Sequence, residues 1–211
     1  MISATVRSGG EVLVAGAVRG LASEVAPLMA LLETFRPEVV GLGISLDELT
    51  GLRDHFVDRA SEPLVPLTGA ETAEVKGLSK FGEVRVPNPA CIEVLEWARS
   101  RGTRVEPLDP SDEEYATMFT EHISYFELLR RTLRERRLAR APPTASTPEE
   151  YAATWHRSMS GGRGSRSFDG ARDAALVESA RRLSARAPRV AVVVDLERYD
   201  SVLRRLAAAT G

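Results

Sequence analysis

Residues 189–195, RVAVVVD, decide the fold of this chain. Five apolar residues follow one another between an arginine and an aspartate, and four of the five are the β-branched valine. A short continuous run of this kind is typical of a strand that is buried on both faces. Such strands belong to parallel sheets that lie between two layers of helices. The stretch therefore predicts an α/β fold with a mostly parallel sheet flanked by helices.

The amino-terminal part of the chain predicts the other strands of this sheet. Residues 11–18 and 38–44 are apolar runs, and the segment between them has apolar residues at helical spacing that stops at Pro37. A strand–helix–strand unit of this kind joins parallel strands by a right-handed crossover. Residues 2–6 precede a Ser-Gly-Gly turn at 8–10, which predicts a hairpin that starts the sheet.

The remainder of the chain is predicted to be mainly helical. Capping residues and apolar periodicity predict helices at 45–57, 91–101, 110 to beyond 138, from 147, 169–186 and 198–208. Residues 103–108 predict one more strand, and 61–86 give mixed signals. The helical run from about 110 to 160 is too long for a simple crossover. We therefore expect one domain over residues 1–211, with a helical subdomain inserted before the last strand.

Four segments mark the ends of the predicted strands and the start of a late helix. They are residues 16–19 (GAVR), 37–43 (PEVVGLG), 172–173 (RD) and 192–197 (VVVDLE). In this order and spacing they resemble the TraB/ChaN/Tiki superfamily, over roughly residues 11–208. The resemblance implies a TraB/ChaN-like sheet and a ligand cleft.

The chain departs from the superfamily at most of its catalytic positions. Members carry a His after the first strand, a Glu in the second strand, an Arg-Asp pair on a late helix and a His after the last strand. In this chain the first His position is occupied by Arg19 and the Glu position by Gly43, and Glu197 lies near the last His position. Only Arg172 and Asp173 match the superfamily directly. Some members, Tiki proteins among them, resemble metal-dependent hydrolases, but arginine has no lone pair for a metal. The resemblance thus implies a scaffold without a metal site, and it leaves the reaction open.

The residues themselves predict a cleft at the same place. Ligands of open α/β sheets bind beyond the carboxyl ends of the strands. The predicted strands end at Arg19, at the 43–45 turn, at Asp109 and at Asp195 with Glu197, so we expect these side chains to converge.

Two functions of different classes remain open for this cleft. In the first, a non-catalytic protein binds a small anionic molecule or a peptide end, because guanidinium groups bind carboxylate and phosphate through paired hydrogen bonds. Its ligand-binding residues are Arg19, Arg172 and Arg198, with Glu197 orienting them. In the second, a divergent hydrolase of esterase or peptidase type uses a carboxylate as general base, with the arginines stabilising an oxyanion. The candidate bases are Glu197, Asp173 and Asp109. A buried ion-pair network is the structural alternative to both.

A glycine- and arginine-rich segment, residues 160–167 (SGGRGSRS), precedes the late helix. Its backbone N–H groups, with Arg163 and Arg166, predict a phosphate cradle or lid over the cleft. A solvent-exposed loop is the alternative. The segment is not a P-loop, because it lacks the Gly-Lys-Ser/Thr ending.

Composition limits the partners and the compartment. The 28 basic and 30 acidic residues nearly cancel, so we expect neither a membrane nor a nucleic-acid partner. The dense basic run at 130–140 is interpreted as a solvated helix face. Cys91 is the single cysteine and no stretch approaches a membrane span, which together favour the cytoplasm. The long helix from Ser111 onward is a candidate homodimer interface.

Metal and cofactor signals are weak. His122, His156 and Asp109 match no strong ligand spacing, and Tyr199 is the sole axial ligand that the predicted cleft offers a haem iron. The sequence leaves the cofactor unknown. The chain has one asparagine and no glutamine, and few thermolabile amides suit a protein from a hot environment. It also has only two lysines, and a GC-rich genome explains this preference for arginine equally well.

Overall fold

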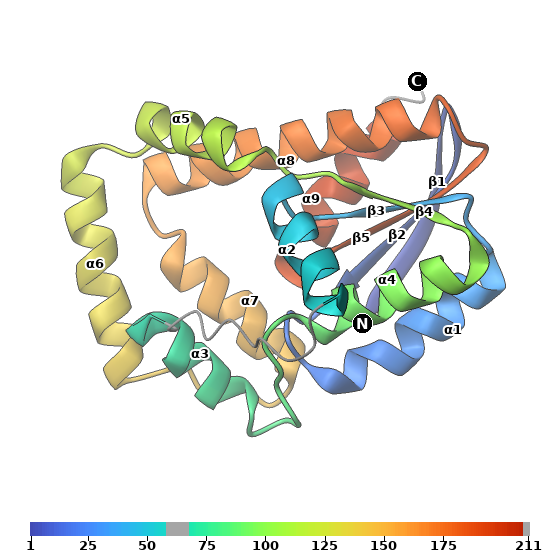
Figure 1. Ribbon diagram of the computed structural model, residues 1–211. Coiled ribbons are helices and arrows are strands. Elements are labelled where there is room, and N and C mark those ends of the chain that lie inside the picture. Colours follow the sequence, from blue (N-terminus) through green and yellow to red (C-terminus); the bar gives the residue numbers. More distant parts are fainter. Residues whose placement is uncertain (58–67, 209–211) are drawn as a thin grey trace.

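The computed structural model describes residues 1–57 and 68–208, and its centre is a five-stranded sheet (Figure 1). The strand order is β1-β2-β5-β3-β4. β1 pairs antiparallel with β2, whereas the other neighbours pair in parallel. The strands are β1 (Ile2–Ser8), β2 (Gly10–Ala17), β3 (Val39–Leu42), β4 (Arg104–Pro107) and β5 (Arg189–Asp195). The mostly parallel α/β sheet predicted from the sequence is confirmed.

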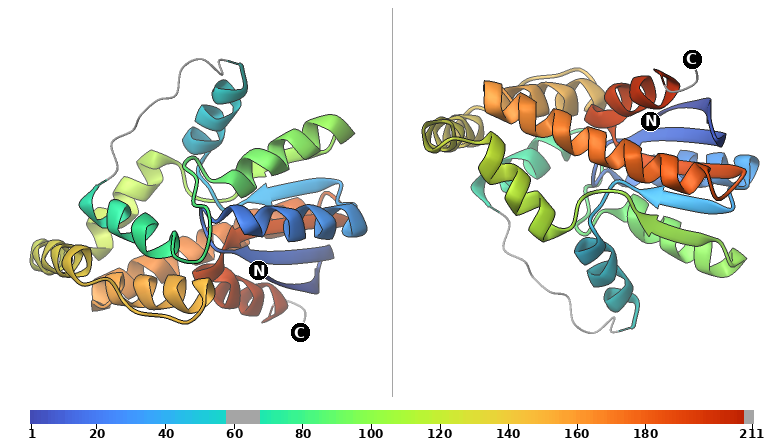
Figure 2. Two further views of the ribbon diagram at one scale, coloured as in Figure 1. Left: turned by 90° about the horizontal axis from the view of Figure 1, so that it is seen from below. Right: turned by 90° about the horizontal axis from the view of Figure 1, so that it is seen from above.

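β5 lies in the middle of the sheet, between β2 and β3. Its alternate residues enter two different cores. Ala191 and Val193 face the layer formed by α1 (Val25–Phe35) and α4 (Pro89–Arg101), together with Leu28, Leu32 and Val94. Val190, Val192 and Val194 face α8 (Arg163–Ser184) and α9 (Leu196–Ala207), together with Leu176 and Val202. The run of valines is needed because both faces of this strand are covered (Figure 2).

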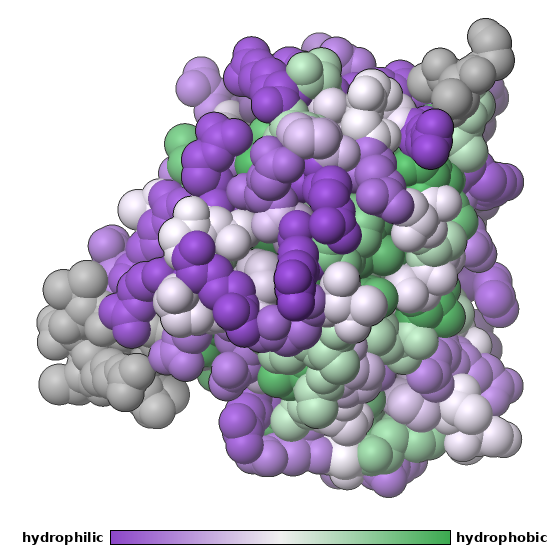
Figure 3. Space-filling view, turned by 90° about the vertical axis from the view of Figure 1, so that its right-hand side faces the viewer, coloured by the Kyte–Doolittle hydropathy of each residue, from purple (hydrophilic) through white to green (hydrophobic). Residues whose placement is uncertain are grey.

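The remaining long helices lie beyond the carboxyl ends of the parallel strands. They are α2 (Leu46–Val57), α3 (Gly69–Leu78), α5 (Asp112–His122), α6 (Tyr125–Arg140) and α7 (Pro148–Met159), and a 3-10 turn, η1 (Ala22–Glu24), precedes α1. A third apolar cluster joins α3 and α7 to the end of β2, with Tyr151, Trp155 and Leu78 packed against Val18. This cluster fixes a helical layer over one end of the sheet. Figure 3 shows the opposite end, where hydrophilic and hydrophobic side chains are interspersed.

Two predicted helix boundaries were wrong. The long helix predicted from 110 to beyond 138 is two helices, because Ile123 is extended and buried and the Ser124 side chain caps a new helix by accepting from the Glu127 N–H. The late helix begins at Arg163 and not at Asp169, so most of the predicted glycine-rich loop is helical. The mixed segment 61–86 contains α3, whereas residues 61–67 lie outside the described part of the chain.

Candidate functional site

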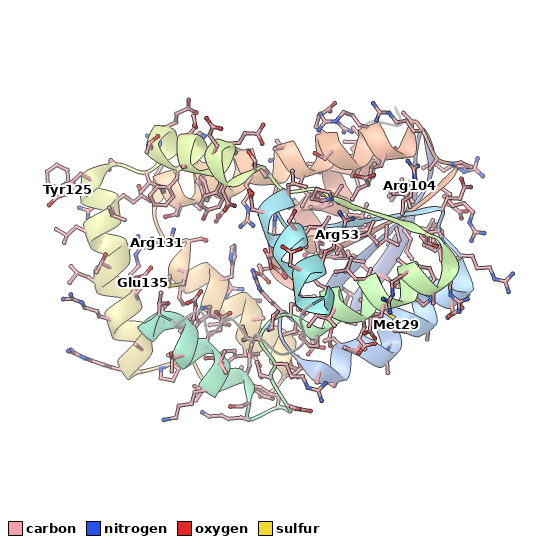
Figure 4. The ribbon with its side chains drawn as sticks, viewed as in Figure 1. Met29, Arg53, Arg104, Tyr125, Arg131 and Glu135 are labelled. Carbon is pink, nitrogen blue, oxygen red and sulfur yellow. The ribbon has the colours of Figure 1, made fainter. Side chains whose placement is uncertain are left out.

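A cleft of about 380 Å³ lies where the carboxyl ends of β2 and β5 meet the helical layer. Arg19 follows β2, and Asp195 and Glu197 end β5 and begin α9. The helical layer contributes Glu71 and Glu74 from α3, Arg131 and Glu135 from α6, Trp155 and His156 from α7, and Arg172 from α8. Figure 4 shows Arg131 and Glu135 on the inner side of α6. Arg19, Arg172 and Glu197 were predicted to meet in one cleft, and the structure places all three in its wall.

Asp109, Asp173 and Arg198 form an ion-pair network that is buried beside the cleft. Arg198 donates from Nε to Asp173 Oδ1 at 2.8 Å and from Nη1 to Asp109 Oδ1 at 2.7 Å. Arg172 donates to the other oxygen of Asp109. The side chains of Asp109 and Arg198 are only 3% and 7% exposed. The network joins the end of β4 to α8 and α9. The buried ion-pair network expected as the alternative for Arg19, Arg172 and Glu197 thus includes Arg172 of those three residues.

The arginines that line the cleft also have carboxylate partners. Arg19 Nη2 lies 3.1 Å from Glu48 Oε1, and Arg19 Nη1 lies 3.7 Å from Asp195 Oδ2. The charge of Asp195 is the main reason that the pKa of Arg19 rises above its ordinary value, and burial opposes it. Arg131 pairs with Glu135 at 3.2 Å. The guanidinium groups of the cleft are therefore already engaged by the protein's own carboxylates.

Two glutamates of the cleft differ from this pattern. Burial, together with the charges of Asp195 and Glu74, raises the pKa of Glu197 to about 8. Burial, together with the charge of Asp195, raises the pKa of Glu74 to about 7, whereas the charge of Arg19 lowers both values. Within residues 1–57 and 68–208, neither glutamate has an ion-pair partner. Carboxyl groups that titrate near neutral pH in a cleft are suited to donate and accept protons.

Sequence reasoning missed Glu74 of the cleft and Glu48, the ion-pair partner of Arg19. Glu74 lies in the segment that gave mixed signals, although Thr68 and Glu71 form a capping box that marks the start of its helix. Burial also raises the pKa of Glu48, although the charge of Arg19 opposes this shift. The capping box was a usable signal for the helix, but only the tertiary fold places α3 over the end of β5.

The predicted phosphate cradle is already filled by a side chain of the protein. Glu127 of α6 accepts hydrogen bonds from the N–H groups of Gly164 at 2.9 Å and Ser165 at 2.7 Å, and from the Ser165 hydroxyl at 3.1 Å. A Cβ atom at Gly162 or Gly164 would overlap the Glu127 carboxylate. The glycines thus admit an internal carboxylate cap at the start of α8.

The two arginines of this segment do not join the cleft. Arg163 and Arg166 are exposed, neither lines the cleft, and Arg166 Nη1 donates to the Gly161 carbonyl at 3.2 Å. With the N–H groups of Gly164 and Ser165 bound to Glu127, the cradle predicted for this segment was wrong.

The histidines have separate partners. His156 lines the cleft, with Nε2 at 3.7 Å from Asp169 Oδ2, whereas His122 Nδ1 lies 3.0 Å from the Ser167 hydroxyl. In the described part of the chain, no group of three His, Cys, Asp or Glu residues has the arrangement of a metal site. Tyr199 packs against Gly16 and does not line the cleft.

A second cavity, of about 470 Å³, lies at the opposite edge of the sheet, between α2, α4 and β4. Its floor is Leu95, Ala98 and Val105, and its rim includes Arg53 and Arg104, which Figure 4 labels. Arg53 donates to the Val105 carbonyl at 3.0 Å. None of the predicted site residues lines this cavity, so the cleft at the strand ends remains the candidate site.

No protein-family model and no curated protein matches the chain. The resemblance to the TraB/ChaN/Tiki superfamily therefore rests on the ordered landmarks alone. Among the described helices, none is long and apolar enough to cross a membrane.

Proposed function

We propose that the cleft is the active site of a hydrolase that uses carboxyl groups as its acid and base, on a TraB/ChaN-like scaffold with α5, α6 and α7 as an inserted helical subdomain. The observation that supports the proposal best is a pair of glutamates that have no ion-pair partner in the described part of the chain. The pKa of Glu74 is about 7 and that of Glu197 is about 8, and both side chains line one cleft.

The two glutamates divide the proton transfers between them. At neutral pH one carboxyl group of the pair is ionised and takes a proton from the attacking water, and the other carries a proton and donates it to the leaving group. Glu197, which the sequence predicted as a candidate base, is therefore one member of an acid–base pair with Glu74.

Arg19 provides the positive charge at this site. The charge of Arg19 lowers the pKa of both Glu74 and Glu197, so its electric field reaches both carboxyl groups. A cation that the fold fixes beside the reacting atoms stabilises a developing oxyanion. Asp109 and Asp173 are poorer candidates for the base, because both accept hydrogen bonds from buried arginine. The substrate class is an ester or a peptide bond.

The test is a screen of chromogenic esters and short peptides against the full chain, followed by two variants. Glu197→Gln keeps the size of the side chain and removes the titration, so we expect turnover to fall by about 10²–10⁴-fold. Glu121→Gln, on the exposed surface of α5, is the matched control and leaves turnover unchanged. Equal turnover of the two variants would refute the assignment.

A second function has one observation in its favour. Arg172 lines the cleft, and its buried Nε atom has no hydrogen-bond partner among the described residues. A small anionic ligand at Arg172 and Arg19 would satisfy this donor, as the sequence predicted for a non-catalytic binding protein. Inorganic phosphate and simple carboxylates, titrated with thermal unfolding as the readout, test it. Stabilisation that Arg19→Gln abolishes, in a chain without hydrolytic turnover, would favour this function over the first.

A further inference from the structure

The outer face of α6 exposes large apolar side chains, and no other described part of the chain covers them. Tyr125 and Phe126 are 77% and 75% exposed, and Leu129 and Leu133 are 52% and 57% exposed. At 100° per residue, Phe126, Leu129 and Leu133 lie on one side of the helix. Figure 4 shows Tyr125 pointing away from the molecule. Isolated exposed apolar residues are ordinary, but a row of this kind on one helix indicates an interaction surface.

The same face is cationic toward its carboxyl-terminal end. Three arginines are exposed there, Arg136, Arg137 and Arg140, and a fourth exposed arginine, Arg130, lies nearer the middle of the helix. The two acidic residues of the helix are directed elsewhere, because Glu127 caps α8 and Glu135 pairs with Arg131 in the cleft. The helix therefore offers an apolar row and a cluster of positive charge, and none of its own carboxylates opposes them.

We propose that this face binds the surface of an anionic phospholipid bilayer. α6 is the outermost helix at its end of the molecule, so a flat surface reaches it without meeting the rest of the protein (Figures 1 and 2). Phe126, Leu129 and Leu133 enter the boundary between headgroups and acyl chains, and the arginines contact lipid phosphates. The net charge of the chain is −2, so the attraction is local to α6.

A second copy of the chain is the other occupant that fits an apolar helix, and charge disfavours it. Pairing two α6 helices through this face brings together the four exposed arginines of each copy, and α6 offers no free carboxylate to offset them. An anionic bilayer lowers the energy of the same charges. This proposal departs from the sequence-based expectation of no membrane partner, which rested on the nearly balanced total charge. It does not depend on the chemistry of the cleft.

The experiment is co-sedimentation of the full chain with vesicles of phosphatidylcholine, with and without phosphatidylglycerol. We expect binding to the mixed vesicles and little to the neutral ones, with affinity falling as salt rises. Arg136→Gln with Arg137→Gln is expected to weaken binding about 30-fold, from about 1 kcal/mol for each arginine near an anionic surface. Phe126→Ser with Leu129→Ser is expected to abolish it.

Two control variants test whether the effect belongs to α6. Arg99→Gln with Arg104→Gln removes two exposed arginines from elsewhere, and Val86→Ser removes an exposed apolar residue. Both controls are expected to bind as the native chain does. All the substituted side chains are exposed, and near-UV circular dichroism verifies that each variant is folded.

Three results would overturn the proposal. The first is no sedimentation of the native chain with anionic vesicles at low salt. The second is equal loss of binding in the control variants. The third is a dimeric mass by light scattering that becomes monomeric in Phe126→Ser with Leu129→Ser, which would make a second copy the occupant.

Discussion

Asp109→Asn removes one negative charge from between two arginines in the interior of the protein. Asp109 is 3% exposed and accepts hydrogen bonds from Arg172 and from Arg198, which is itself 7% exposed. Removing one partner from a buried ion pair destabilises a protein by about 3–5 kcal/mol, because the other charge stays buried without compensation. Asparagine keeps the size and one acceptor oxygen, so the lower end, about 3 kcal/mol, applies. At about 2–4 °C per kcal/mol for a chain of this length, the melting temperature falls by about 6–12 °C.

The assay is thermal unfolding by circular dichroism, together with urea unfolding to give the free energy. Glu121→Gln, an exposed carboxylate on α5, is the control and is expected to change stability by no more than about 0.5 kcal/mol. A loss of less than about 1 kcal/mol in Asp109→Asn, with an unchanged urea m-value, would refute the claim that this network holds β4 to α8 and α9.

Three further predictions concern the cleft and the helices around it. The folded-state pKa of Glu197 is about 8 and its ordinary value is 4.5, so the folded chain binds more protons than the unfolded chain between these pH values. The free energy of unfolding therefore falls as pH rises through this range. Urea unfolding at several pH values is expected to show a smaller dependence of this free energy on pH in Glu197→Gln. Gly77→Ala places a Cβ atom against the Tyr151 ring and is expected to destabilise the folded chain by about 1–3 kcal/mol. Gly69→Ala is the control, because its Cβ atom meets no neighbouring atom, and it is not expected to destabilise the chain. Thermal unfolding measures both. Hydrogen bonds from Ser165 and Gly164 lower the pKa of Glu127. Glu127→Gln is therefore expected to destabilise the folded chain by about 1 kcal/mol at neutral pH and by less as pH falls below 4.5. An equal loss of stability at neutral and acidic pH would contradict a charged cap.

The sheet could be predicted because its signals are local. The run of valines in β5, the Ser-Gly-Gly turn after β1 and the proline after α1 each act within a few residues. The place of the cleft could also be predicted, since parallel strands bring their carboxyl ends to one edge. Arg19, Asp195 and Glu197 were identified in this way, and all three line the cleft.

The parts that could not be predicted depend on contacts between distant segments. The glycines of residues 160–167 suggested a phosphate site, but they accommodate Glu127, which is 37 residues from Gly164 along the chain. No local pattern identifies that partner. Glu74 belongs to the cleft because α3 packs on α7 through Tyr151, a contact between residues far apart in sequence.

The predicted anion clamp depended on charges whose partners the sequence does not give. The sequence predicts Arg172 and Arg198 as ligand-binding residues, but Asp109 accepts hydrogen bonds from both. Whether an arginine is free to bind a ligand is decided by the carboxylates that the fold brings beside it. In this cleft the fold engages the arginines, and two glutamates have no ion-pair partner among the residues that the structure describes.

The proposed hydrolase requires that Glu74 and Glu197 titrate near neutral pH, and carboxyl ¹³C NMR measures this directly. Glutamate labelled at the side-chain carboxyl is titrated in the native chain, and Glu74→Gln and Glu197→Gln assign the two resonances. We expect apparent pKa values of about 7 for Glu74 and about 8 for Glu197. Titration of both groups near their ordinary value of 4.5 would rule out the acid–base pair, because neither carboxyl group would then carry a proton at neutral pH.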